Sequence, residues 1–215
     1  MQLLGGMMKS RPAVIVLAAG TGSRFAAPGH KLTQRLGSSS VLGSTLRHAL
    51  ATQLPVVVVT TEALADGARR HVASRDVVVL PVVGTPGPQP LGMGFSIAAG
   101  VSARPDATGW LVLPGDMPLI RTATMLAVAE ALEQHPVAYA QYRGRRGHPV
   151  GFAAELYSEL ATLTGDEGAR RLVARYPAHG VDVDDPGVLI DVDTEADLER
   201  VRTQQAQQAT APMPR

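Results

Sequence analysis

The chain has 215 residues, 45% of them hydrophobic, with a net charge of +1. This length suits one α/β domain with a substantial core. The near-neutral charge and the aromatic content of 4% argue against a nucleic-acid partner, because such proteins carry basic surfaces or base-stacking side chains. The lack of cysteine excludes disulfides, Cys-ligated zinc and iron–sulfur clusters, and it is compatible with a reducing compartment.

The N-terminal segment does not have the pattern of a secretory signal. Its positive charges come late, at Lys9 and Arg11, and the apolar run after them ends in a glycine without a small-residue cleavage site. No apolar run approaches the ~18 residues of a membrane span. We therefore expect a cytoplasmic protein with no membrane partner, one folded domain over residues 12–204, and flexible termini at 1–11 and 205–215.

Short β-branched runs alternate with helical patterns along the first two thirds of the chain. Buried strands are expected at 13–17, 56–59, 77–80, 110–113 and 137–140, and helices at 42–50, 62–73, 95–103 and 122–134. This alternation predicts an α/β fold with a single doubly wound, mostly parallel mixed sheet of the Rossmann-like type.

The last third is less regular. Helices are expected at 153–163 and 166–176, and half-buried strands at 181–184 and 189–193. Thr194 and Asp197 have the spacing of a capping box, so a final helix should begin there and run to about Gln204.

A glycine-rich loop follows the first strand and is the best candidate site. It comprises Leu17, Ala18, Ala19, Gly20, Thr21, Gly22 and Ser23, with Arg24 and Lys31 close behind. Ligands of open α/β sheets bind beyond the carboxyl ends of the strands, and small residues there let main-chain amides approach an anion. The Walker and dinucleotide fingerprints are both absent. The alternative is an ordinary strand-to-loop turn in which the glycines serve only geometry.

Acidic residues at two distant places are candidate ligands of a hard divalent cation. Asp116 follows the strand at 110–113, and Asp191 and Asp193 end the late strand expected at 189–193, where their spacing would put them on one strand face. Mg²⁺ needs only one or two carboxylates, since phosphate oxygens and water complete its octahedron. The alternatives are a turn or N-cap aspartate at 116 and solvent-facing or turn residues at 191 and 193.

Two further segments could contact substrates. A glycine-rich turn into a helix, with Gly92, Gly94 and Ser96, could offer amides to a base or phosphate, or it is a plain β–α turn. A basic cluster could receive an anionic acceptor, or it is a solvated hairpin tip; it comprises Arg143, Arg145, Arg146, Gly147, His148 and Pro149. The other histidines show no ligand spacing and are interpreted as surface or capping residues: His30, His48, His71, His135 and His179.

The string L-A-A-G-x-x-x-R followed by K resembles the signature of the MobA-like NTP transferases, of the GT-A-like nucleotidyltransferase superfamily. The resemblance extends to G-D-M-P at 115–118, D-x-D-T-x-x-D-L at 191–198, P-x-G-M-G-x-S at 90–96 and G-x-x-G-H-P-V-x-F at 144–152. Phe25-Ala26 departs from the Met-Gly of many relatives, and the stretch 26–30 is longer than usual.

This resemblance implies roles for the candidate residues. The loop amides, with Arg24 and Lys31, would hold the NTP phosphates, and the 92–96 turn would lie near the base. Asp116 would bind Mg²⁺ together with Asp193, with Asp191 as an accessory or alternative ligand. The basic segment would face the acceptor.

Within the family, the chain is most similar to the molybdenum cofactor cytidylyltransferases. Ala18-Ala19-Gly20, Gly115 and the Gly-Met-Gly string favour this group. The implied reaction transfers CMP from CTP to the phosphate of molybdopterin and releases pyrophosphate, with possible handover to a molybdoenzyme or its chaperone. The alternatives are a GTP-dependent enzyme, an enzyme acting on a sugar phosphate or phospho-alcohol, and a non-catalytic cofactor carrier.

Overall fold

The computed structural model describes residues 11–81 and 92–210. The strands are β1 (Ala13–Ala18), β2 (Arg35–Leu36), β3 (Ser39–Ser40), β4 (Val56–Thr61), β5 (Val77–Leu80), β6 (Gly109–Pro114), β7 (Val137–Tyr142), β8 (Arg145–Ala153) and β9 (Ala178–Asp182). The helices are α1 (Val41–Ala51), α2 (Glu62–Arg69), α3 (Gly92–Ser102), α4 (Thr122–Ala131), α5 (Tyr157–Leu160), α6 (Arg170–Arg175) and α7 (Glu195–Thr210). Short 3-10 turns are η1 (Lys31–Thr33), η2 (Ser74–Asp76), η3 (Ala154–Leu156) and η4 (Pro186–Leu189).

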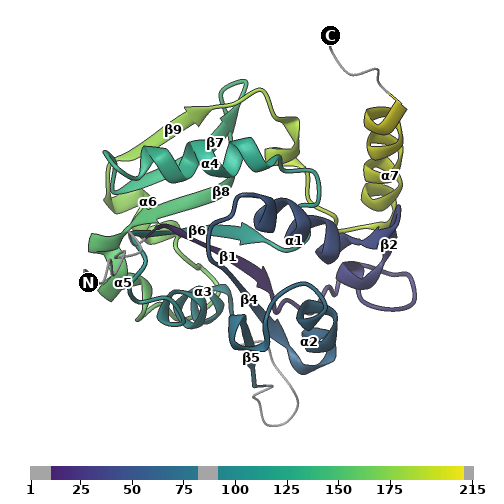
Figure 1. Cartoon of the computed structure of the whole chain (residues 1–215), viewed down its shortest axis with the longest axis horizontal. Helices are drawn as coiled ribbons and strands as arrows, with labels where there is room; N and C mark the ends of the chain where they lie inside the picture. Colours follow the sequence, from purple (N-terminus) through teal and green to yellow (C-terminus); the bar gives the residue numbers. More distant parts are fainter. Residues whose placement is uncertain (1–10, 82–91, 211–215) are drawn as a thin grey trace, which may run out of the picture.

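The main sheet has the strand order β5-β4-β1-β6-β8-β7-β9. Neighbouring strands pair in parallel except at β8, which pairs antiparallel with both β6 and β7. The predicted doubly wound, mostly parallel mixed sheet is therefore confirmed. Carboxyl ends of β1, β4 and β6 meet at one edge of the sheet, where the chain passes into the loops that carry the candidate residues (Figure 1).

Helices cover both faces of the sheet, which explains why the strands are apolar throughout. Along β1, Val14 and Val16 pack into a core with helices α1, α2, α4 and α7, whereas Ile15 packs into a second core with α3, α5 and α6. Figure 1 shows α1 and α4 on one side of the sheet and α3 and α5 on the other. Successive side chains of a strand point to opposite faces, so a strand between two helical layers must be apolar at every position.

The structure corrects four predictions about the last third of the chain. Residues 189–193 do not form a strand: η4 ends at Leu189 and the following residues run without regular structure to Thr194. The helix expected at 153–163 is divided into η3 and α5, and the one at 166–176 is reduced to α6. The basic segment, read as a turn, is mostly strand β8.

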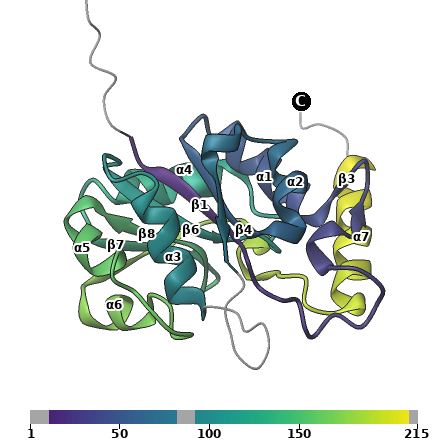
Figure 2. The ribbon, with the colours of Figure 1, turned by 90° about the horizontal axis from the view of Figure 1, so that it is seen from below.

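The final helix packs against the small β2–β3 ladder at one end of the molecule (Figure 2). Arg202 donates two hydrogen bonds to the Arg35 carbonyl, and the buried side chains of Leu198 and Val201 belong to the same core as Leu36. Helix α7 continues to Thr210, beyond the predicted end near Gln204. Among the helices of residues 11–81 and 92–210, none combines the length and apolar character that a bilayer span requires.

Candidate functional site

The loops after β1 and β6 are joined through Gly115. Its N–H donates to the Leu17 carbonyl over 2.8 Å, and its carbonyl accepts a hydrogen bond from Thr45 Oγ1 at 2.9 Å. A Cβ at position 115 would lie 2.9 Å from the Leu17 oxygen and 3.2 Å from Leu42 Cδ1. Only glycine allows this close approach. The backbone packing therefore explains why glycine stands at position 115, whichever nucleotide is bound.

The glycine loop has the geometry of an anion-binding turn. Gly22 has a φ of +63°, in the left-handed region, and its carbonyl accepts from the Phe25 N–H at 2.9 Å. That bond is the one internal main-chain hydrogen bond of residues 19–25 in the described structure, so the amides of Thr21 and Ser23 remain available. Phe25 is buried and anchors the loop to the core.

Asp116 and Asp193, 77 positions apart in the sequence, meet at one ammonium group. Lys31 Nζ donates to Asp116 Oδ2 and to Asp193 Oδ1, both at 2.6 Å. Arg24 Nη1 lies 2.7 Å from Asp193 Oδ2, although the Arg24 side chain is 75% exposed. Four of the residues that the sequence singled out for phosphate and metal binding are thus brought into one cluster beside the glycine loop.

The charges in this cluster stabilise each other strongly. Burial alone would lower the pKa of Lys31, but the Asp116 carboxylate and the hydrogen bonds to both acids outweigh it and raise that pKa above its usual value. Since a raised pKa means a preference for the charged form, Lys31 stays an ammonium ion between the two carboxylates.

Two features place Asp193 next to Asp116. The Val192 N–H donates to the Asp116 carbonyl at 2.9 Å, which holds the two segments together. Immediately after Asp193, the predicted capping box is confirmed: Asp197 N–H donates to Thr194 Oγ1 at 3.2 Å, and Thr194 N–H donates to Asp197 Oδ2 at 2.8 Å. The acid therefore lies between an anchored extended segment and a fixed helix start.

Asp191 is an exposed residue, but its carboxyl group is partly buried beside the cluster. Burial of its carboxyl raises the pKa of Asp191, and the neighbouring Asp193 carboxylate raises it further, with a smaller contribution from Asp116. The shared strand face predicted for Asp191 and Asp193 is wrong because no strand forms there, yet the two carboxyls are still close enough to interact.

Asp185 supports this arrangement and was not singled out from the sequence. Its side chain is 2% exposed and accepts from Arg121 N–H at 2.8 Å, Thr124 Oγ1 at 2.6 Å and Gly187 N–H at 3.0 Å. It thereby joins the start of α4 to η4, the turn that leads to the acids. A buried aspartate before a Pro-Gly turn was the available signal, but burial cannot be read from one sequence.

The donor set fits a hard divalent cation. Asp116 Oδ1 is buried and has no hydrogen-bond partner among the described residues. It is therefore an unsatisfied acceptor, which a cation or a hydrogen-bond donor would stabilise. Carboxylate oxygens are the ligands that Mg²⁺ prefers, and it usually binds protein through one or two of them. In the described part of the chain, no three His, Cys, Asp or Glu side chains are grouped so that they could hold a metal ion by themselves.

The glycine-rich segment expected as a turn is the beginning of α3, and it is partly committed to the fold. Gly94 N–H donates to the Gly165 carbonyl at 2.8 Å, and Ser96 Oγ bonds back to the Gly92 carbonyl at 3.3 Å. A Cβ at Gly92 would lie 2.6 Å from Gly165, so this glycine permits close backbone packing. Of the amides that this segment was expected to offer to a ligand, that of Gly94 is therefore already bonded within the protein, and residues 90 and 91 of the string lie outside the described residues.

The basic segment forms the β7–β8 hairpin. Arg143 and Gly144 are its two turn residues, with φ values of +50° and +74°, as a tight hairpin turn requires. The guanidinium of Arg143 lies over the Tyr142 ring at 5.1 Å, and that of Arg146 over the Tyr139 ring at 4.4 Å. Both arginines are exposed, and they stack on aromatic rings that limit their conformations.

The predicted acceptor residues of this hairpin divide into two groups. A Cβ at Gly147 would lie 2.3 Å from the Val188 carbonyl, so Gly147 is a packing residue, and Pro149 is buried. His148 lies within electrostatic range of the acids: burial lowers its pKa, Asp116 opposes this shift and Arg146 reinforces it. Gly147 and Pro149 thus serve packing, whereas Arg143 and Arg146 are exposed and His148 is partly exposed.

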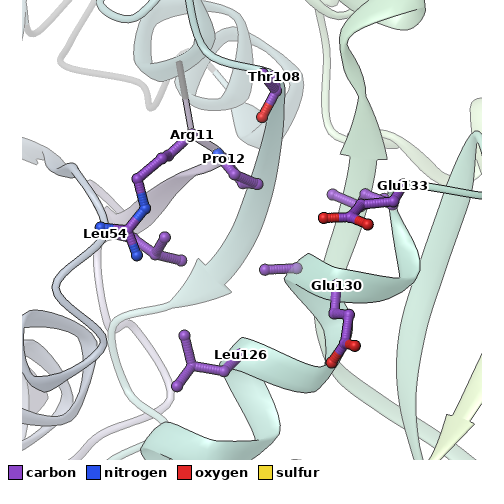
Figure 3. Close-up of a pocket in the computed structure, with 9 residues that line it drawn as sticks. Arg11, Pro12, Leu54, Thr108, Leu126, Glu130 and Glu133 are labelled. Atoms are coloured by element: carbon purple, nitrogen blue, oxygen red, sulfur yellow. The ribbon is translucent and has the colours of Figure 1, made fainter. Parts of the chain in front are cut away.

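A cavity of about 510 Å³ lies elsewhere in the molecule. It is lined by Arg11, which precedes β1, by Leu54 and Thr108, and by residues of α4 and its C-terminal turn, including Leu126 and Glu130 (Figure 3). Arg11, Leu54 and Thr108 precede β1, β4 and β6 respectively, so the cavity is at the amino ends of these strands. The glycine loop and the acids lie at the opposite ends, and the cavity is not part of the candidate site.

Comparison with known proteins agrees with this geometry. Residues 14–181 match the model of the MobA-like NTP transferase domain. The bifunctional protein GlmU of Kineococcus radiotolerans is 36% identical over 176 residues, which cover 79% of this chain and 35% of that protein. The chain thus matches about a third of the length of this relative.

Solved structures give the same result over more of the chain. Rv0371c from Mycobacterium tuberculosis H37Rv superposes with a TM-score of 0.77 and 28% identity, covering 92% of this chain and all of that one. A manganese complex of Rv0371c superposes with a TM-score of 0.71 and 27% identity, covering 90% and 99%. With its family match spanning most of the sheet and both candidate loops, this chain belongs to the MobA-like NTP transferase family.

Proposed function

We propose that the chain is a nucleotidyltransferase, of the class that transfers a nucleoside monophosphate from an NTP to a phosphorylated acceptor. The observation that carries the proposal is the meeting of Asp116 and Asp193 at Lys31 Nζ, beside a loop with free amides. Such a site combines anion-binding and cation-binding groups within a few ångströms, as nucleotide chemistry requires.

The reaction needs positioning and charge neutralisation more than covalent chemistry. An acceptor phosphate oxygen attacks the α-phosphorus, a new P–O bond forms, and the bond to the bridging oxygen breaks to release pyrophosphate. The amides of the glycine loop, together with Arg24 and Lys31, bind the β- and γ-phosphates and stabilise the leaving pyrophosphate. A phosphate acceptor is already anionic, so no general base is needed and His148 serves to position it.

Asp116 and Asp193 are the proposed ligands of Mg²⁺, and the unpartnered Asp116 Oδ1 supports this role. When bound, Mg²⁺ supplies charge neutralisation at the phosphate oxygens. Asp191 is the accessory acid. The manganese complex of Rv0371c supports a divalent cation in this fold, and Mg²⁺ is our specific proposal.

We further propose CTP as donor and molybdopterin as acceptor, in a cytoplasmic pathway that ends with handover to a molybdoenzyme or its chaperone. The resemblance of the Leu17–Gly20 loop and of the Gly92–Ser96 turn to the cytidylyltransferases supports this choice. Gly115 does not support the choice of CTP, because its close backbone contact with Leu17 requires glycine whichever nucleotide is bound. Arg143, Arg146 and His148 are the proposed contacts of the acceptor phosphate.

The test is pyrophosphate release from each of CTP, GTP, ATP and UTP, with Mg²⁺ and either molybdopterin or a sugar phosphate. We expect release with CTP and molybdopterin. Release with GTP or with the sugar phosphate would replace the specific proposal and keep the general one. Pterin binding without pyrophosphate from any NTP would instead indicate a cofactor carrier.

Variants of the acids separate their roles. We expect Asp116→Asn and Asp193→Asn each to lower kcat about a hundredfold or more, because each removes charge from the site of phosphoryl transfer. Asp191→Asn is the matched control and should lose far less. Equal losses in all three variants, or near-normal turnover of Asp116→Asn in a folded protein, would contradict the metal assignment.

A further inference from the structure

His30 connects the glycine loop to the segment that carries Lys31. Its Nδ1 accepts from the Leu32 N–H at 3.1 Å, and its Nε2 lies 2.9 Å from the Gly20 carbonyl oxygen. Because Nδ1 is the acceptor, the proton of the neutral ring is on Nε2, which donates to Gly20. The ring is thus bonded on both sides, and each bond selects the same tautomer.

The same ring lies against the next glycine of the loop. A Cβ at Gly22 would be 3.3 Å from His30 Nε2 and 3.4 Å from Lys31 Cγ, whereas one at Gly20 would have no neighbour within 4 Å. The loop is therefore backed by His30 and Lys31 on one side and open around Gly20 on the other.

Holding the Gly20 carbonyl has a direct consequence for the amide that follows it. The peptide bond between Gly20 and Thr21 is trans, so its C=O and N–H point in opposite directions. With the carbonyl oxygen turned to His30, the Thr21 N–H points away from the ring. A rotation of this peptide would do the reverse and present a carbonyl oxygen where the anion has to bind, which is repulsive.

We propose that His30 is a positioning residue that holds the Gly20–Thr21 peptide in the orientation that binds an NTP phosphate. The proposal rests on the proposed function and adds a residue to it, one interpreted from the sequence as merely surface or capping. The bond to Leu32 fixes the ring relative to Lys31. The Thr21 amide and the Lys31 side chain are therefore positioned relative to each other through His30.

Two variants separate capping from positioning. In His30→Asn, the side-chain oxygen takes the place of Nδ1 and can still accept from Leu32, but the side chain is too short to reach Gly20. In His30→Gln, the amide nitrogen takes the place of Nε2 and can still donate to Gly20. A purely capping role predicts that Asn is the better replacement, whereas positioning of the peptide predicts that Gln is.

The measurements are the Kd of CTP, GTP, ATP and UTP with Mg²⁺, the KM of the NTP and of the acceptor, and the thermal midpoint. We expect Asn to raise the Kd and KM of the NTP about tenfold, the equivalent of one hydrogen bond, with the acceptor KM and thermal midpoint little changed. Gln should recover most of the NTP affinity. Equal affinity of both variants and the parent, or losses that follow only the thermal midpoint, would overturn the positioning role while the parent still binds NTP.

A second readout does not depend on nucleotide. Nitrogen-15 NMR of the histidine rings, with His30 assigned by its disappearance in His30→Asn, should show a neutral ring protonated at Nε2. A ring protonated at Nδ1 would overturn the proposal, because Nε2 could not then donate to Gly20. If the parent binds no NTP at all, the proposed function fails and this role fails with it, a result distinct from a failure confined to the His30 variants.

Discussion

The Val192 N–H lies 2.9 Å from the Asp116 carbonyl oxygen, and this main-chain bond holds the segments of the two candidate metal ligands side by side. Neither partner contributes its side chain to the bond, so the side chain of Asp116 remains directed to the cluster. The bond thus keeps the two stretches of backbone that carry the acids next to each other.

Replacing Lys31 by methionine should make the protein dependent on divalent cations. Without the ammonium group, Asp116 and Asp193 face each other with only Arg24 to compensate, and we expect a loss of about 3 kcal/mol in the free energy of unfolding. Adding Mg²⁺ or Mn²⁺ should raise the thermal midpoint of the variant more than that of the parent, because the cation replaces the lost charge. The absence of any such difference would count against the acid pair as a metal site.

Gly115→Ala should destabilise the fold. The added Cβ would lie 2.9 Å from the Leu17 oxygen, and overpacking of this kind costs about 1–3 kcal/mol. Gly20→Ala is the matched control on the neighbouring loop, since its Cβ would meet nothing within 4 Å. Urea unfolding of the two variants should show a loss for the first and little change for the second; equal stability would refute the close approach.

Asp185→Ala should be among the more damaging single changes outside the cluster. It leaves the Arg121 and Gly187 amides and the Thr124 hydroxyl without their acceptor, at a cost of about 3 kcal/mol. The exposed Asp184, whose carbonyl rather than side chain bonds to Arg121, provides the control: Asp184→Ala should stay within about 0.5 kcal/mol of the parent. The comparison is made by chemical denaturation.

The capping box predicts a pH dependence of stability. Hydrogen bonds from Thr194 lower the pKa of Asp197 below its usual value, against a smaller opposing effect of burial. A carboxyl whose pKa is lower in the folded state stabilises the protein above the unfolded pKa of 3.8, and this contribution is lost as the pH falls through the folded pKa.

Asp197→Asn should therefore be less stable than the parent at neutral pH, and the difference should shrink in acid. Denaturation of both proteins at about pH 6 and at about pH 3 measures it. A difference that does not change with pH would show that the charge on Asp197 does not contribute.

The elements that could be predicted from sequence are those whose environment leaves a local pattern. The runs at 56–59 and 110–113 are apolar at every position because helices cover both faces of their strands, and β4 and β6 form there. The Thr194–Asp197 capping box could also be predicted, because its two partners lie within one turn of the chain and their spacing is visible in the sequence. Asp116 and Asp193 could be identified as partners from their positions in the sequence and from the family resemblance, but their shared contact with Lys31 could not.

What could not be predicted depends on contacts between distant segments. Residues 189–193 alternate like a strand, yet the Val192 amide is taken by Asp116, outside any ladder, and no strand forms. Strand β8 was missed because it begins with the charged residues Arg145 and Arg146, whereas its pairing with β6, for example Val150 with Val112, depends on a distant segment. The Gly94 amide, in the segment expected to offer amides to a ligand, donates to the Gly165 carbonyl, a contact across more than 70 residues.

Two glycines of the β7–β8 hairpin differ in how readily they could be replaced. Gly144 at the tip has open space around it, whereas Gly147 at the base is pressed against the Val188 carbonyl. Side chains at the tip can therefore be exchanged without disturbing Val188, which belongs to the segment that leads to Asp193. If the hairpin receives the acceptor as proposed, this separation would let the choice of acceptor change while the acid cluster stays the same.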